Sequence, residues 1–311
     1  MVVFIKPRDL KVINTEDLII LRRGIINISE VEINKDRSTR NFLDKFQEFI
    51  ANRRLELSES SEIMEDFDKL ARMGLINREY DKSQKVLFLV NSSDFDYYKE
   101  YLSPKYEVEN IDSLLSIKEA ELIVQDKNVL EINSLLEKFS RIFKPYSWIY
   151  FIDSTYHLSK IKAFNYLICK LNKLSTFAIV DNENLYLFGV EYRKTGCFEC
   201  LEKHILTKFD IAEQELNVAD NIDRDFDLVS SSIILGLLLR DLKNINLFGQ
   251  SQLIGNYLHF YLPTFDYEFN INRIATSCKV CSTITNTNFK EQNMNSINIL
   301  KGLRNGDFDI K

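Results

Sequence analysis

Two short stretches decide how this chain folds: Cys197 to Cys200, which reads CFEC, and Cys278 to Cys281, which reads CKVC. Two residues between paired cysteines let the backbone turn tightly enough for both sulfurs to reach one metal ion. Two such pairs supply four thiolates, so the spacing predicts a tetrahedral zinc site with these four cysteines as ligands. Because four protein ligands leave no coordination position open, the Zn2+ is expected to be structural and not catalytic.

The alternative for each cysteine pair is redox chemistry, because a single C-x-x-C motif beside a βαβ unit is typical of thioredoxin-like proteins. The doubled motif favours metal over a redox pair. His204 lies four residues after Cys200 and could also reach a metal, although four cysteines already complete the set. The fifth cysteine, Cys169, lies within a helical apolar pattern that predicts an ordinary core residue.

Length, composition and charge exclude several classes of protein. The 311 residues predict two domains, and 45% hydrophobic residues are enough for sizeable cores. A net charge of -6 argues against nucleic-acid binding, which usually requires a basic face. The first residues, MVVFIK, lack the basic region of a signal peptide and predict a strand. The longest apolar run, 228–239, contains three serines and is shorter than the roughly 20 residues of a membrane span. With four cysteines assigned to metal, we expect a cytoplasmic protein.

Residues 1–90 have the pattern of a winged-helix-like module. Strands are expected at 10–13, 18–21 and 25–28. Apolar residues at helical spacing then predict a helix over 42–50, capped by Ser38 or Thr39, and a second over 63–71, capped by Ser60 or Ser61 and ended by Gly74. A strand at 86–90 completes the predicted module.

Residues 91–311 have the pattern of an α/β domain. Short apolar runs at 85–90, 122–125, 148–152 and 177–180 predict buried strands, and stripes at 135–143 and 160–171 predict helices between them, which indicates a mostly parallel sheet. Residues 181–184 are expected to form a hairpin turn. Further helices are expected at 199–209 and 228–243 and a strand at 257–262, before a polar tail from 283.

A parallel sheet raises the question of nucleotide binding, and the sequence offers no phosphate loop. No glycine occurs between Gly74 and Gly189, and residues 91–96, which follow the first α/β strand, read NSSDFD. Side chains there would block the backbone approach that a polyphosphate needs, and the aspartates would repel it. The three histidines are scattered, and Asp153 at a strand end is expected to be a helix cap. We therefore assign no catalytic and no cofactor-binding residues.

The order of these parts resembles the McbB family, the zinc-containing B subunits of microcin-type thiazole/oxazole synthetases. The residues that carry the resemblance are the four cysteines and the hairpin that leads into Thr195-Gly196-Cys197. That family is a degenerate branch of the ThiF-like, ubiquitin-activating-enzyme superfamily. The resemblance implies a winged-helix-like leader-peptide recognition element in residues 1–90. It implies a degenerate ThiF-like, Rossmann-type domain with the zinc site in residues 91–311.

For function, the resemblance implies a non-catalytic subunit of a peptide cyclodehydratase complex in bacteriocin biosynthesis. Such a subunit binds the leader of a ribosomal precursor peptide. It activates a YcaO-type ATP-dependent partner, which converts Cys, Ser and Thr residues to azolines. A flavin dehydrogenase often joins the complex, and the subunit is expected to be a homodimer within it. Active members of the superfamily adenylate a carboxylate with a glycine-rich loop, from which this chain departs at residues 91–96.

Two other functions remain open at this point. One is a zinc-stabilised winged-helix transcription regulator. Its reading helix over 59–73 would carry five carboxylates against two basic side chains, which would repel DNA phosphates. The other is a residual ThiF-like adenylyltransferase, which would bind ATP.

The leader peptide is expected to bind residues 1–90 as an added β-strand. The strand expected over Ile25, Ile26, Asn27 and Ile28 would offer an unpaired edge whose main-chain groups any extended peptide can use. The resemblance implies that the peptide also contacts the following helix, at Met64, Phe67, Asp68 and Ala71. For Met64 and Phe67 the alternative is that they fill the core of the module.

Overall fold

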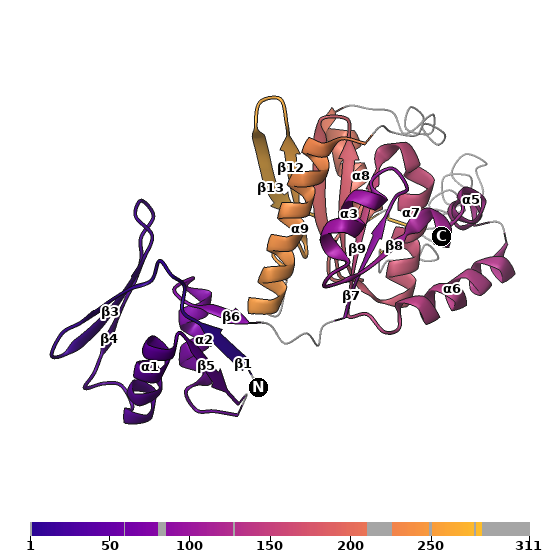
Figure 1. Cartoon of the computed structure of the whole chain (residues 1–311). Coiled ribbons are helices and arrows are strands. Elements are labelled where there is room, and N and C mark those ends of the chain that lie inside the picture. The colour runs from indigo at the N-terminus through magenta and orange to yellow at the C-terminus, as the bar shows by residue number, and fades with distance from the viewer. Residues whose placement is uncertain are drawn as a thin grey trace, which may run out of the picture. The chain divides into compact units, whose positions relative to one another are not determined.

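The structure is a computed structural model that describes residues 2–281, apart from 59, 80–84, 127, 210–225, 249–250 and 277. The chain divides into two compact units, and Figure 1 labels most of their helices and strands. The first contains Met1–Lys85 and Gly236–Gln252, and the second contains Val86–Leu235 and the chain from Leu253. The boundary between them falls within helix α9 (Leu228–Phe248).

The first unit has two small antiparallel sheets and two helices in its amino-terminal part, and it also contains the part of α9 from Gly236. Its elements are β1 (Val2–Ile5), β2 (Lys11–Asn14), β3 (Leu18–Arg23), β4 (Ser29–Asn34), α1 (Arg40–Asn52), β5 (Arg54–Leu57), α2 (Met64–Arg72) and β6 (Asn77–Glu79). The sheets have the strand orders β5-β1-β6 and β2-β3-β4. Helix α1 begins where the Thr39 side chain accepts a hydrogen bond from the Phe42 backbone, one of the two caps expected.

The core of the first unit is built around Phe67 of α2, which is fully buried. Its ring lies 5.3 Å from Phe4 of β1 and 5.6 Å from both Phe42 and Phe49 of α1, measured between ring centroids. Aromatic pairs at these separations are stabilising beyond the area that they bury. The spacing of apolar residues along α1 and α2 therefore serves to pack both helices on the β5-β1-β6 sheet.

Three expectations for the first unit are wrong. Residues 25–28 form the turn between β3 and β4, and the third strand is Ser29–Asn34. The turn begins at Gly24, where φ is +97° and a Cβ atom would lie 2.3 Å from the Asn27 carbonyl oxygen, so that only glycine fits. Neither expected serine caps α2, whose first turn has no side-chain cap. The strand at 86–90 belongs to the second unit, because it pairs with strands of the large sheet.

The second unit is an α/β domain around one seven-stranded sheet. Its elements are β7 (Val86–Val90), α3 (Phe95–Leu102), β8 (Glu107–Asn110), α4 (Ile111–Leu114), α5 (Ile117–Gln125), α6 (Val129–Phe143), β9 (Trp148–Ser154), α7 (Leu158–Leu171), β10 (Leu174–Asp181), β11 (Asn184–Val190), α8 (Phe198–Phe209), β12 (Asn256–Tyr261) and β13 (Asp266–Ile271), with a 3-10 turn at Thr155–His157. The strand order is β13-β12-β11-β10-β9-β7-β8.

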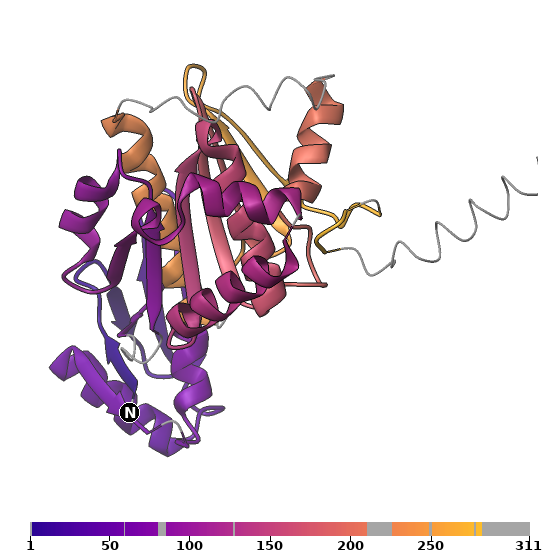
Figure 2. The same cartoon turned by 90° about the vertical axis from the view of Figure 1, so that its right-hand side faces the viewer.

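The pairing of the strands changes from parallel to antiparallel at β10. Strands β8, β7, β9 and β10 are parallel, and β11 to β13 continue the sheet in antiparallel pairs. The hairpin turn expected at 181–184 is confirmed, because β10 and β11 pair up to Asp181 and Asn184. Helices α5, α6 and α7 cover one face of the sheet (Figure 2), where Phe139, Phe151 and Phe164 are fully buried.

Two further expectations need correction. Residues 122–125, which were expected to be a strand, are the end of helix α5. That helix begins at a capping box between Ser116 and Glu119. The second parallel strand is Glu107–Asn110 instead. That strand lies at the end of the sheet and reads Glu-Val-Glu-Asn, so it lacks the apolar run of a buried strand. No helix among the described residues is long and apolar enough to cross a membrane.

Candidate functional site

The structure brings the four cysteines of the two C-x-x-C pairs together in the second unit. Their sulfurs all lie within 4.8 Å of one another, and all four residues are buried. The sulfur separations are 3.9 Å for Cys197 and Cys200, 3.6 Å for Cys197 and Cys278, 3.2 Å for Cys200 and Cys281, and 3.5 Å for Cys278 and Cys281. Four sulfurs at about 2.3 Å from a tetrahedral metal would be about 3.8 Å apart. The cluster therefore fits a metal ion bound by four thiolates.

The first cysteine pair is held by buried amides from other elements. Asn165 of α7 accepts a hydrogen bond from the Phe198 backbone at 3.0 Å, at the start of α8. The side chain of Asn272 donates to the carbonyl oxygens of Gly196 and Cys197 at 2.9 and 3.4 Å. These contacts attach the first pair to α7 and to the segment after β13. Neither asparagine was predicted from the sequence, since isolated amides carry no spacing signal.

Backbone groups hold the second pair against the first. The Ala275 backbone donates to the Cys200 sulfur at 3.3 Å, and the Cys281 backbone donates to the Cys278 sulfur at 3.5 Å. Hydrogen bonds to sulfur favour the thiolate, which is the form that binds metal. The chain between the pairs includes α9, β12 and β13, so a metal at this site closes a long loop.

Cys169 is the buried core residue that was expected. It is fully buried in α7 and belongs to the same apolar core as Cys197. The proximity of the Cys197 sulfur and burial both raise the pKa of the Cys169 thiol. Cys169 remains outside the four-sulfur cluster. His204, the other candidate ligand, is also outside the cluster and lies edge-on to the Tyr257 ring.

Gly196 provides a direct test of the packing around the cysteines. A Cβ atom at this position would lie 2.4 Å from the side-chain oxygen of Asn272 and 2.8 Å from the Arg273 carbonyl oxygen. We expect Gly196→Ala to destabilise the second unit by about 1–3 kcal/mol, the usual cost of overpacking. The temperature of thermal unfolding and the metal content of the purified chain should both fall.

Gly236→Ala is the matched control, because a Cβ in that part of α9 meets nothing within 4 Å among the described residues. Replacing a helical glycine by alanine normally stabilises by about 0.5–1 kcal/mol. If Gly196→Ala unfolds at the same temperature as the wild type and keeps its metal, the close approach of Asn272 is not what holds the first pair.

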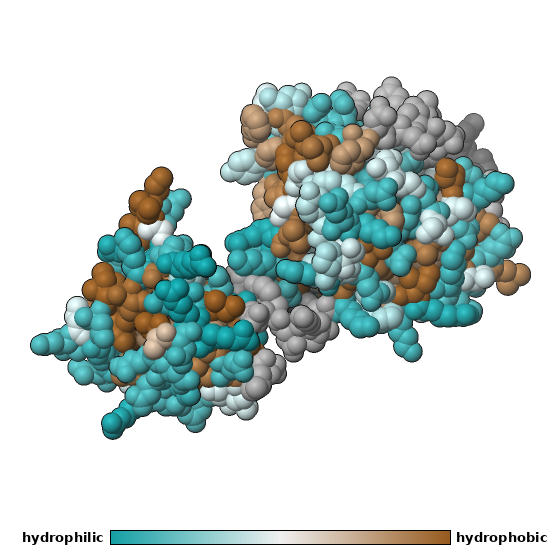
Figure 3. All heavy atoms as spheres, in the orientation of Figure 1, coloured by the Kyte–Doolittle hydropathy of each residue, from teal (hydrophilic) through white to brown (hydrophobic). Residues whose placement is uncertain are grey.

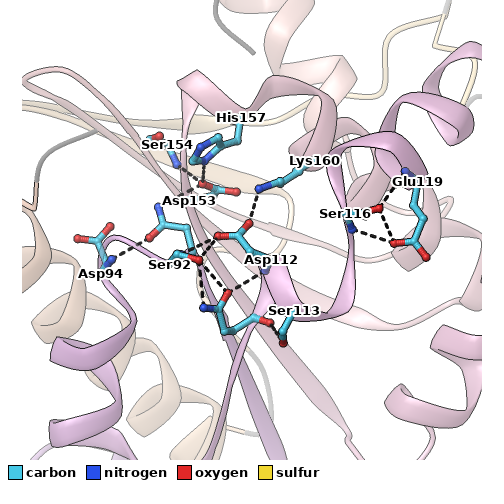
Figure 4. Close-up of polar contacts among 12 residues, drawn as sticks. Ser92, Asp94, Asp112, Ser113, Ser116, Glu119, Asp153, Ser154, His157 and Lys160 are labelled. Atoms are coloured by element: carbon cyan, nitrogen blue, oxygen red, sulfur yellow. Dashed lines mark hydrogen bonds and ion pairs between the residues drawn. The ribbon is translucent and has the colours of Figure 1, made fainter. Parts of the chain in front are cut away.

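A second cluster of polar side chains lies at the carboxyl ends of β7 and β9 (Figure 4). One oxygen of Asp153 accepts hydrogen bonds from His157 at 2.7 Å, from the Ser154 backbone at 2.8 Å and from Asn91 at 3.2 Å. Its other oxygen is buried and has no hydrogen-bond partner among the described residues. The hydrogen bond to Asp153 raises the pKa of His157. Asp153 therefore binds the turn that leads into α7, but it is not the helix cap that was expected, because neither the 3-10 turn nor α7 has a side-chain cap hydrogen bond.

Lys160 and Asp112 form an ion pair in the same cluster. Burial acts to raise the pKa of Asp112, but hydrogen bonds from Lys160 and Ser92 outweigh it and lower the pKa. Ser92 donates to Asp112 through its backbone at 2.8 Å. The chain's own side chains thus occupy the point where the strand order reverses, which is where open α/β sheets bind ligands.

The amino-terminal end of α3 lies beside the side chain of Asp94, which occupies the place where an anion would bind. Asp94 precedes this helix and is only 4% exposed. Its carboxylate accepts a hydrogen bond from Ser231 at 2.9 Å, and its backbone donates to Asn91 at 3.0 Å. A phosphate at a helix start binds free backbone donors. Here a buried carboxylate lies beside those donors, so an anion would meet like charge.

The residues expected to bind a leader peptide do not form one surface. Ile25 and Ile26 are 89% and 94% exposed in the β3–β4 turn. Met64, Phe67 and Ala71 are buried in the core of the first unit, which is the alternative stated for the first two. Asp68 is paired with Arg78 of β6 at 3.1 Å. The other two expected residues, Asn27 and Ile28, lie in the same turn as the exposed isoleucines.

Comparisons with known proteins agree with this fold. No protein-family model matches the sequence, and no curated protein matches it. Among solved structures, a heterocyclase in complex with substrate and cofactor matches with a TM-score of 0.52 and 11% identity, over 91% of this chain and 39% of that chain. The heterocyclase TruD matches with a TM-score of 0.50 and 8% identity, over 91% and 43%. A chain of the E. coli microcin synthetase McbBCD complex matches at 0.42 and 14%, over 89% and 99%.

These comparisons define a class of fold. At such low identity the two heterocyclase matches show a fold related to that of heterocyclases and nothing finer. The chain spans about two fifths of the length of the heterocyclase chains that it matches.

Proposed function

We propose that this chain is the leader-peptide-binding and activating subunit of a peptide cyclodehydratase complex. The observation that carries the proposal is the heterocyclase-related fold over 91% of the chain. The matched heterocyclase chains contain a further part, more than half of their length, with no counterpart among these 311 residues. A YcaO-type partner, which the resemblance to the McbB family implies, would supply that part and with it the ATP-dependent chemistry. Some complexes would also contain a flavin dehydrogenase.

The cysteine cluster and the polar cluster at the ends of β7 and β9 both support a subunit without catalytic activity of its own. A metal with four thiolate ligands has no position for a substrate, so we propose that the cysteine cluster holds a structural Zn2+. The switch point between β7 and β9 is occupied by Asp112, Asp153 and Lys160, which leaves no donor set for a triphosphate among the described residues there. Both features support a subunit that does not catalyse ring formation itself.

The leader peptide would bind the first unit as an added strand. Since residues 25–28 are a turn, we place the peptide on β4, which pairs only with β3 among the described residues and is mostly exposed. A strand at the end of a sheet offers unpaired main-chain donors and acceptors, and side chains of alternate residues then supply specificity.

Reconstitution tests the whole proposal. The chain would be mixed with ATP, the YcaO-type protein and the precursor peptide encoded near its gene. The product mass would fall by one water for each azoline ring, and neither protein alone would produce the change. Ring formation by the YcaO-type protein at an equal rate without this chain would contradict an activating role.

The chain alone is expected not to bind ATP. Asp94 faces the start of α3, and no glycine between residues 75 and 188 allows the backbone to surround phosphates. Titration calorimetry with ATP and Mg2+ should show no heat of binding. A dissociation constant in the micromolar range would favour a residual adenylyltransferase instead.

A further inference from the structure

Strand β13 ends the large sheet with an open edge. Within the part of the chain that the structure describes, it pairs only with β12. Its six residues include no proline, lysine or arginine, and there is no interruption in their pairing with β12. Proteins usually protect a sheet edge with such residues, with bulges or with a covering segment. An open edge of six residues is therefore a surface prepared for another strand.

The side chains of β13 alternate in character. Tyr267, Phe269 and Ile271 point to one face and are 74%, 50% and 59% exposed. The other face carries Asp266, Glu268 and Asn270. Figure 3 shows brown, hydrophobic surface in the area of β12 and β13. Large exposed apolar side chains grouped on one strand are characteristic of an interaction site.

We propose that β13 pairs with β13 of a second copy of this chain, antiparallel and centred on Phe269, so that two seven-stranded sheets become one. This names a surface for the homodimer expected from the sequence. The surface itself follows from β13 and does not depend on leader binding in the first unit.

The register follows from symmetry and charge. A two-fold axis through a continuous antiparallel sheet is perpendicular to it, so one residue must lie opposite itself. Centring the pair on Tyr267 or Glu268 would place carboxylates opposite carboxylates, which is destabilising. Centring it on Phe269 places Tyr267 opposite Ile271 and Glu268 opposite Asn270. Centring it on Asn270 also avoids repulsion but pairs fewer residues of the strand.

The same pattern favours a second copy over an unrelated peptide. An arbitrary extended peptide could form the main-chain hydrogen bonds of this edge. Its side chains would not in general place apolar residues beside Tyr267, Phe269 and Ile271 and an amide beside Glu268. β13 matches itself in both respects. The partner is therefore a second copy, and binding of a peptide or of the chain's own segment after residue 281 would leave the protein monomeric.

The first experiment measures mass in solution by sedimentation equilibrium of the full metal-bound chain. We expect twice the chain mass of 36.5 kDa, and the monomer mass for Phe269→Lys, which places two ammonium groups opposite each other. Tyr101→Lys is the matched control, because Tyr101 is similarly exposed, at 59%, on α3. Unchanged metal content and thermal unfolding would show that Phe269→Lys is folded. A monomeric wild type, or a dimer unaffected by Phe269→Lys, would overturn the proposal.

The second experiment tests the register by disulfide formation between copies under mild oxidation. Phe269→Cys should cross-link to itself, whereas Glu268→Cys should not. A mixture of Glu268→Cys and Asn270→Cys chains should form the mixed disulfide. Self-linking of Asn270→Cys in place of Phe269→Cys would overturn the register proposed here. The same chains assayed for leader binding separate this inference from the proposed function, since either can fail alone.

Discussion

Cys278→Ser is expected to abolish stoichiometric metal binding and to unfold much of the second unit. Serine does not provide a thiolate, so one ligand is lost and the remaining sulfurs stay buried around an incomplete site. Apparent binding free energies of structural zinc sites are about 10–16 kcal/mol, whereas whole domains are stable by only about 5–15 kcal/mol. The loss is therefore comparable to the total stability of the unit. Elemental analysis should fall from one metal per chain to well under one, with loss of circular dichroism on mild heating.

Cys169→Ala is the matched control, because this cysteine is buried in the same core as Cys197 but lies outside the four-sulfur cluster. It should retain one metal per chain and lose only local packing. Replacing the metal by Co2+ would identify the ligands, because four thiolates give strong charge-transfer absorption. A folded wild-type protein that contains no metal after gentle purification would rule out the structural zinc.

Proline substitution in β4 is expected to abolish leader binding at one of two neighbouring positions. In an antiparallel strand, successive residues direct their backbone N–H groups to opposite sides. Of Val31→Pro and Glu32→Pro, one therefore removes a donor to β3 and the other a donor to the peptide. Each lost main-chain hydrogen bond is worth about 1 kcal/mol, and the proline ring would also obstruct the incoming strand. We expect at least a roughly tenfold weaker affinity for the variant that faces the peptide.

Fluorescence anisotropy with a labelled synthetic leader of the precursor peptide provides the measurement, and thermal unfolding of the same variants provides the control. The variant that unfolds at the wild-type temperature should be the one that no longer binds. If both variants bind the leader with wild-type affinity, the β4 edge is not the site. N-methylation of alternate amides in the leader should reproduce the effect from the peptide's side.

The sequence alone determined what depends on local spacing. Two C-x-x-C pairs indicated a four-sulfur cluster because the gap within each pair sets the reach of the sulfurs, and the apolar stripes of α1, α2, α6 and α7 located these helices because burial imposes a period of 3.6 residues. The turn at 181–184 was found because its polar residues separate two apolar runs. The absence of glycine after β7 likewise needed no structure.

Tertiary structure decided whatever depends on residues distant in the sequence. It showed that Phe67 fills a core formed with β1 and α1, that Asn272 holds the first cysteine pair, and that β13 lies at an edge of the described sheet. Residues 25–28 are mostly apolar and β-branched, so propensity favoured a strand, but Gly24 turns the chain and the pairing of β3 with β4 places them at the tip. Strand pairing and side-chain contacts are long-range interactions, and no local pattern specifies which surface will be left exposed when they are complete.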